Sequence, residues 1–185
     1  MGSTVLEGLI ASGHPLEQIS ATTKSVESAA RFRSRGISAM AIDEAADANA
    51  LLAGDADLIV LGVKPYQIKD VLSEIKDEIA PNAVVISMAA GIKLATMAEV
   101  MPGIKNLIRT MPNTPALFGM GVTGVAPAKT ASAEAVEATM GLNNCECAGK
   151  VRCQLCGQST ISLRLILTAA LQSYRLPNAP IRLPT

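Results

Sequence analysis

The chain has 185 residues, and its 16 basic and 16 acidic side chains give a formal net charge of zero, which argues against a basic nucleic-acid footprint. Aromatic residues make up only 2% of the chain, so base stacking is almost excluded, while a hydrophobic content of 49% argues against a disordered chain. No apolar run approaches the roughly 18 residues that span a bilayer, and no signal peptide is visible, so we expect a cytoplasmic protein that does not bind membranes.

Apolar periodicity predicts alternating helices and strands over residues 1–141. We expect helices over residues 1–13, 25–35, 43–53, 68–79, 94–101 and 132–142. We expect strands over residues 19–22, 37–42, 58–61, 83–87, 105–110 and 122–126. Strands that alternate with helices in this way predict parallel βαβ units. The fold class is therefore α/β, with a doubly wound, Rossmann-like parallel sheet and ligands at the carboxyl ends of its strands.

The order of the first elements departs from that pattern. A doubly wound nucleotide domain begins with a strand, whereas residues 1–13 predict a helix. A helix with no strand before it leaves a gap at the centre of the sheet. We therefore expect an incomplete dinucleotide-binding domain over residues 1–141 that lacks its first strand.

Residues 142–185 differ in composition from the rest of the chain. They hold five basic residues, one acid (Glu146) and all four cysteines: Cys145, Cys147, Cys153 and Cys156. Four thiolates could bind zinc, but a Cys-x-Cys half is not a common structural-zinc spacing. Periodicity is weak here, as in translation from another reading frame or a foreign exon. We predict an irregular tail that is not a packed domain and holds no metal.

Three motifs carry a resemblance to a known family. They are RTMPNTPALFGMGVTG at residues 109–124, LGVKP at residues 61–65 and SMAAGI at residues 87–92. In this order, they resemble the N-terminal dinucleotide-binding domain of the pyrroline-5-carboxylate reductase family, the last enzyme of proline synthesis. The resemblance implies reduction of 1-pyrroline-5-carboxylate, a small molecule, to L-proline with NADPH.

The same resemblance implies that parts of the family pattern are absent. The family begins with a strand and a Gly-x-Gly-x-x-Gly-like turn, of which residues 1–2 match only the end. Its second domain is a helical bundle that forms the homo-oligomer and carries a Ser-Gly-Ser-Gly-Pro-Ala-Tyr segment, which this sequence lacks. Two alternatives stay open: a non-catalytic truncated or frameshifted fragment with weak or no nucleotide binding, and a small zinc module fused to a partial α/β domain.

The resemblance assigns residues to the adenosine and pyrophosphate side of the cofactor. Met1 and Gly2 match the phosphate turn, and the helix after them would offer N–H groups to the pyrophosphate. Thr23 and Lys24 follow the strand that meets the adenosine ribose. No acid occurs between Gln18 and Glu27, so this turn suits the 2′-phosphate of NADPH better than the free hydroxyl of NADH. Asn49 matches a family position on the adenosine side.

A second group of residues is expected to face the nicotinamide. It comprises Val63, Lys64 and Pro65, Ala90 and Gly91, and Asn113 and Thr114. Each set follows a predicted strand, and the small residues at 90–91 would let the nicotinamide ring approach the backbone. The first 141 residues hold no Ser/His/Asp or Cys/His set for nucleophilic catalysis, and no catalytic side chain is assigned.

Overall fold

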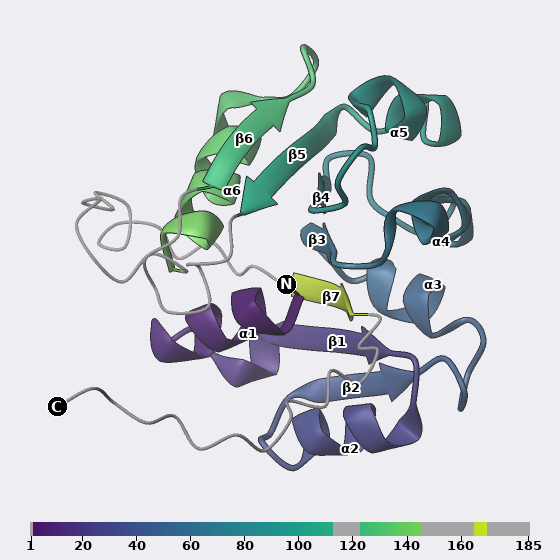
Figure 1. Ribbon diagram of the computed structural model, residues 1–185, viewed down its shortest axis with the longest axis vertical. Coiled ribbons are helices and arrows are strands. Elements are labelled where there is room, and N and C mark those ends of the chain that lie inside the picture. The colour runs from purple at the N-terminus through teal and green to yellow at the C-terminus, as the bar shows by residue number, and fades with distance from the viewer. Residues whose placement is uncertain (1, 113–122, 146–164, 170–185) are drawn as a thin grey trace, which may run out of the picture.

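The structure is a computed structural model that describes residues 2–112, 123–145 and 165–169 (Figure 1). The described strands form one sheet in the order β2-β1-β7-β3-β4-β5-β6. Their bounds are β1 Ile19–Thr23, β2 Ser38–Ala41, β3 Leu58–Leu61, β4 Val84–Ser87, β5 Asn106–Pro112, β6 Thr123–Pro127 and β7 Leu165–Ala169. This arrangement confirms the predicted α/β class with a mainly parallel sheet.

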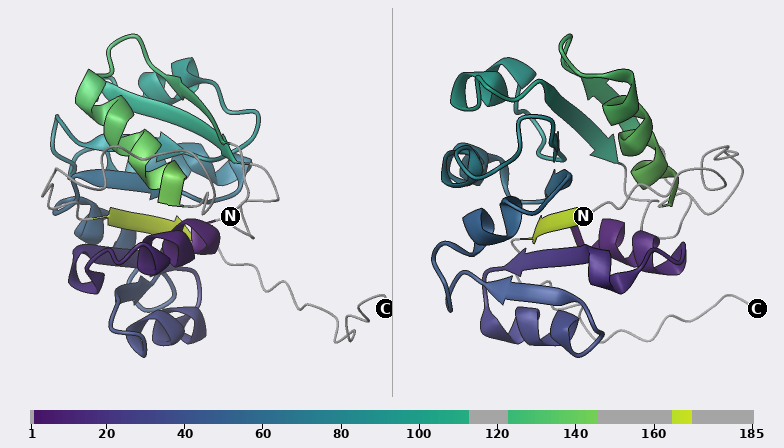
Figure 2. Two further views of the ribbon diagram at one scale, coloured as in Figure 1. Left: turned by 90° about the vertical axis from the view of Figure 1, so that its left-hand side faces the viewer. Right: turned by 180° about the vertical axis from the view of Figure 1, so that it is seen from behind.

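Helices cover both faces of the sheet. They are α1 Gly2–Ala11, α2 Val26–Arg33, α3 Ala48–Ala53, α4 Ile68–Ile75, α5 Leu94–Val100 and α6 Ala133–Cys145. Two short 3₁₀ helices, η1 Leu16–Gln18 and η2 Pro65–Gln67, lie in connections. Figure 2 shows α1 and α6 on one side of the sheet and α3, α4 and α5 on the other.

The side chains of the central strands point alternately to the two faces of the sheet, which explains the two helical layers. On β3, Leu58 and Val60 pack in one apolar cluster with residues of α1, α2 and α6, whereas Ile59 and Leu61 pack in a second with residues of α3, α4 and α5. Successive side chains of a strand point to opposite faces. A continuous apolar run in a strand, such as residues 58–61, is therefore covered by helices on both faces of the sheet.

The centre of the sheet differs from the expectation. The gap predicted beside β1 is filled by β7, which lies between β1 and β3 and is parallel to both. Leu167 is in register with Ala21 on one side and Val60 on the other. The expectation of a wholly irregular tail was therefore wrong for residues 165–169, whose LILTA run has strand length but finds its partners far away in the sequence.

Three smaller differences concern direction and length. β6 pairs antiparallel with β5, a direction that was not predicted because an apolar pattern does not encode the direction of pairing. α3 begins only at Ala48, after turns over residues 43–47 in which two aspartates favour local turns over helix. α6 continues to Cys145, past the boundary expected at residue 141. Within the described part of the chain, no helix is long and apolar enough to cross a membrane.

Candidate functional site

The parallel strands end at one edge of the sheet, and several predicted site residues follow those ends. Thr23 closes β1 and Lys24 follows it; residues 63–65 follow β3, and residues 90–91 follow β4. Ligands of doubly wound sheets bind outside this carboxyl edge. The structure therefore brings these residues to the edge where a cofactor is expected.

Gly2 reaches the same edge from the first helix. It is buried at the start of α1, and α1 contacts β7. Residues 12–18 join the end of α1 to the start of β1, so α1 runs against the strands and begins beside the arrowhead of β7 (Figure 2). Met1, Asn113 and Thr114 lie outside the described residues.

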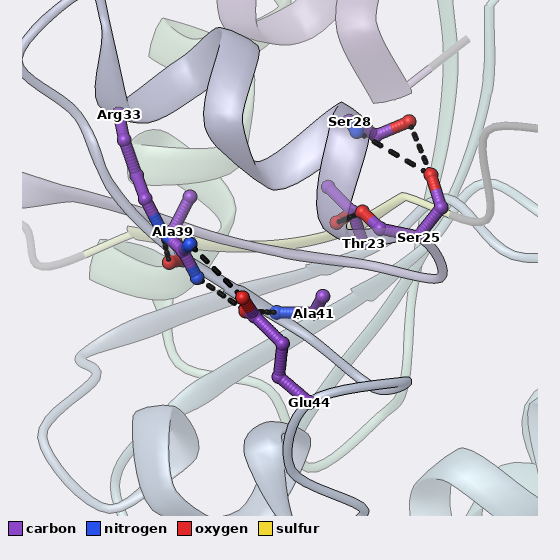
Figure 3. Close-up of polar contacts among 7 residues, drawn as sticks. All are labelled: Thr23, Ser25, Ser28, Arg33, Ala39, Ala41 and Glu44. Atoms are coloured by element: carbon purple, nitrogen blue, oxygen red, sulfur yellow. Dashed lines mark hydrogen bonds and ion pairs between the residues drawn. The ribbon is translucent and has the colours of Figure 1, made fainter.

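The turn from β1 into α2, residues 23–28, is held by its own side chains (Figure 3). Thr23 is buried, and its Oγ1 donates to the Ser25 carbonyl at 2.9 Å. Ser25 caps α2 by accepting from the Ser28 amide at 3.3 Å, and its Oγ donates to Ser28 Oγ at 3.0 Å. Lys24 is exposed. The turn thus fixes its backbone and leaves one cation accessible.

A charged pair links α2 to β2 and to the turn after β2 (Figure 3). Arg33 donates from Nε to the Ala39 carbonyl at 2.7 Å and from its two terminal nitrogens to Glu44 at 3.2 and 2.5 Å. Hydrogen bonds from Arg33, assisted by the Ala41 amide, hold the pKa of Glu44 below its ordinary value. The Glu44 carboxylate is therefore engaged by a cation rather than free to repel a phosphate.

Asn49 is buried near the start of α3, with only 2% of its surface exposed. Its Nδ2 donates to Oε2 of Glu74 on α4 at 2.7 Å. Its Oδ1 is buried and has no hydrogen-bond partner among the described residues. Asn49 thus holds one satisfied and one unsatisfied polar atom.

The turns after β3 and β4 are less tightly bonded. Lys64 and Pro65 are exposed, and the Lys64 amide donates to Oε1 of Gln67 at 3.3 Å. Gly91 has a φ of 77° with open space where a Cβ would lie, so glycine is required there by the left-handed backbone and not by crowding. The turn after β4 thus presents small residues at the edge, whereas the turn after β3 presents Lys64 and Pro65.

Sequence reasoning overlooked polar groups on β5 and β6. Nε of Arg109 and Oγ1 of Thr110 on β5, and Oγ1 of Thr123 on β6, are buried without a hydrogen-bond partner in the described part of the chain. In the sequence analysis, Arg109 appeared only as the first residue of a motif. A cationic residue within a buried strand could itself have indicated a functional residue. The described residues hold no group of three or more potential metal ligands.

A doubly wound sheet with polar turns along its carboxyl edge defines the class of nucleotide-binding α/β proteins. A family model described as NADP oxidoreductase coenzyme F420-dependent matches residues 1–91. The chain is 40% identical over 129 residues to the pyrroline-5-carboxylate reductase of Escherichia coli K12, covering 69% of this chain and 46% of that protein.

Solved structures agree with the sequence relatives. A pyrroline-5-carboxylate reductase from Coxiella burnetii superposes with a TM-score of 0.68 at 25% identity, over 92% of this chain and 55% of that one. The Plasmodium falciparum pyrroline carboxylate reductase, solved with NADP bound, has the same fold at a TM-score of 0.64 and 23% identity, over 78% and 50% of the two chains. The chain belongs to the pyrroline-5-carboxylate reductase family, and it spans about half the length of these relatives.

Proposed function

We propose that the chain binds a nicotinamide dinucleotide and acts in the NADPH-dependent reduction of 1-pyrroline-5-carboxylate to L-proline. The observation that carries this proposal is the alignment of Thr23, Lys24, Val63, Ala90 and their neighbours along one carboxyl edge of a doubly wound sheet. Its family relatives are named for that reaction, and one related structure holds NADP.

Each part of the edge suits one part of the cofactor. The first turn of α1, beginning at Gly2, would offer unpaired N–H groups to the pyrophosphate. The turn after β1 would hold the adenosine ribose. The turns at Val63–Lys64–Pro65 and at Ala90–Gly91 would lie against the nicotinamide. Asn113 and Thr114 are assigned to the same end by the family motif alone.

Chemically, the bound dinucleotide would supply a hydride to the carbon of a protonated cyclic imine. The protein's own contribution is to orient the two reactants and to exclude water. Small residues after β4 allow close approach, because Gly91 lacks a side chain and Ala90 carries only a methyl group. No side-chain acid is assigned, so the chain's part in catalysis is one of positioning.

The turn after β1 favours NADPH over NADH. An NADH-specific site places an acid there to bind the 2′-hydroxyl, and residues 19–26 contain none. The exposed ammonium of Lys24 instead offers a charged donor to a 2′-phosphate. The Glu44 carboxylate is neutralised by Arg33, so it does not oppose that phosphate.

Cofactor titrations test this proposal directly. We expect the purified chain to bind NADPH more tightly than NADH, and Lys24→Glu to weaken NADPH binding about tenfold or more while changing NADH binding little. Lys69→Glu, a change of the same charge at an exposed position on α4, is the matched control. Equal losses for the two cofactors would remove Lys24 from the 2′-phosphate site. No binding of either cofactor would overturn the proposed function.

The reaction is tested by supplying 1-pyrroline-5-carboxylate with NADPH. We expect NADPH oxidation that requires the imine and yields an equal amount of proline, at a rate proportional to chain concentration. Cofactor binding without turnover would limit the role to binding and support the non-catalytic alternative. The cytoplasmic location, the preference for a small-molecule substrate over nucleic acid or membrane, and homo-oligomer formation stay predictions.

A further inference from the structure

Two neighbouring helices share one polar contact at their interface. Asn49, on α3, is 2% exposed, whereas its partner Glu74 is an exposed residue of α4. The 2.7 Å hydrogen bond from Asn49 Nδ2 to Glu74 Oε2 joins them. A surface carboxylate therefore reaches inward to hold a buried amide.

This contact fixes which way the amide of Asn49 faces. An ionised carboxylate only accepts hydrogen bonds, so the Asn49 atom beside Glu74 must be the NH₂ group. The oxygen Oδ1 is then directed elsewhere. It is a buried acceptor that meets no donor among the described residues. Such an atom normally has a partner, and the partner it requires is a hydrogen-bond donor.

The location of Asn49 indicates what that donor belongs to. α3 follows β2 and its turn, and it contacts β1 and β7, whose carboxyl ends form the edge proposed for the cofactor. The adenosine half of a dinucleotide presents two kinds of donor, a ribose hydroxyl and the amino group of adenine, whereas its phosphates only accept. A buried acceptor at this end of the sheet fits one of those donors.

We propose that Glu74 is a positioning residue that orients Asn49 so that its Oδ1 accepts a hydrogen bond from a donor on the adenosine half of the bound cofactor. This inference rests on the proposed function. It adds Glu74 to the proposed cofactor site. No sequence motif indicates this residue, because a glutamate on the polar face of α4 is expected to be a solvent-facing charge. Glu74 itself touches no ligand and acts through Asn49.

Three variants separate this role from simple helix packing. Glu74→Ala removes the acceptor, Glu74→Gln keeps an oxygen that can accept from Asn49 Nδ2, and Asp70→Ala removes another exposed carboxylate from the same helix. We expect NADPH binding to weaken about fivefold to tenfold in Glu74→Ala, to recover most of that loss in Glu74→Gln and to change less than twofold in Asp70→Ala. Thermal melts of all three check that each variant is folded.

The relative affinities for nucleotide analogues provide a measurement that loss of helix packing alone would not change. The probes are adenosine 2′,5′-bisphosphate, its 3′-deoxy form and its inosine form, which lacks the amino group. We expect the unaltered chain to bind one of the two analogues about fivefold to tenfold more weakly than adenosine 2′,5′-bisphosphate, and that analogue identifies the donor. In Glu74→Ala, we expect the affinities for that analogue and for adenosine 2′,5′-bisphosphate to differ less than twofold.

The outcomes distinguish this inference from the proposed function. If the unaltered chain binds NADPH but Glu74→Ala binds it equally well, or weakens all probes by one common factor, Glu74 has no positioning role. If neither analogue differs from the parent nucleotide, Oδ1 meets water rather than cofactor, and the inference is overturned. If the chain binds no nucleotide, the proposed function fails and the inference fails with it.

Discussion

The sheet consists of two blocks that differ at their carboxyl edges. The first block is β1 and β2, the second is β3 to β6, and β7 is the described strand that joins them. At the edge of the first block, Thr23, Ser25 and Ser28 bond to one another. At the far end of the second block, Arg109 Nε and Thr110 Oγ1 are buried with no partner in the described ranges.

This difference indicates two ways of preparing a ligand site. The turn of the first block is preorganised, so a ligand that binds there loses little free energy to ordering the protein. The second block carries unmet hydrogen-bonding capacity, and each such buried group costs about 1–3 kcal/mol while it stays unpaired. The second block therefore has more to gain from a bound molecule or from the rest of the chain.

The largest expected effect comes from breaking the strand between the blocks. Leu167→Pro removes an N–H from a strand that has neighbours on both sides, where proline is not tolerated. We expect a loss of about 3 kcal/mol or more in the free energy of unfolding, which lowers the melting temperature by about 6–12 °C. Leu167→Val, which retains the N–H, is the control. Equal melting temperatures for the two variants would show that β7 does not join the blocks in solution.

A matched pair of substitutions tests the contrast between the two edges. Thr23 and Thr110 are both almost fully buried, at 1% and 2% exposure. Only the Thr23 hydroxyl has a partner, the Ser25 carbonyl. We expect Thr23→Val to cost about 1 kcal/mol, and Thr110→Val to be neutral or stabilising, because it removes an unpaired hydroxyl. Urea denaturation measures both, and a larger loss at Thr110 would contradict the contrast.

Elements of the fold that depend on residues close together in the sequence could be predicted, whereas elements that depend on residues far apart could not. The helix predicted over residues 25–35 and the strand predicted over residues 58–61 depend on neighbours in the sequence, and both are present as α2 and β3. β7 was missed because its partners, β1 and β3, lie in a distant part of the chain and no local pattern names them. The antiparallel direction of β6 was missed for a different reason, since its partner β5 is the preceding strand but an apolar pattern does not encode the direction of pairing.

For the site, the sequence could predict only which residues lie near strand ends. Thr23, Lys24 and Gly91 were placed at or after predicted strands, and the structure has them at or after the ends of β1 and β4. Glu74 could not be found this way, because its role depends on a contact between two helices. Arg109 was named in a motif, but the burial of its Nε emerges only once β4, β5 and β6 are assembled.

The smallest expected effect is a pH dependence that comes from an ion pair beside the first block. Three ion pairs lie on the helices and turns beside β1 and β2, including Glu7 on α1 with Arg35 after α2. Arg35 donates to both carboxylate oxygens of Glu7, at 2.5 and 2.9 Å, and these hydrogen bonds lower the pKa of Glu7 below its ordinary value of 4.5 against an opposing effect of burial.

The sign of the pH effect follows from that lowered pKa. Because the folded state holds the Glu7 proton less tightly than the unfolded state, the pair stabilises the fold fully above pH 4.5, and this contribution is lost as pH falls through the lowered pKa. The Glu7 side chain is 54% exposed, so solvent screening keeps the contribution within about 1 kcal/mol. We expect Glu7→Gln to reduce the free energy of unfolding slightly at pH 7 and to flatten the decline of that free energy below pH 4.5.

Glu27→Gln is the control, because it breaks the more exposed pair with Arg31 and should change the pH dependence of stability less. Amide exchange at low pH should then rise in β1 and β2 before β3 and β4, and exchange that rises equally in both blocks would show that the ion pairs do not set the difference between them.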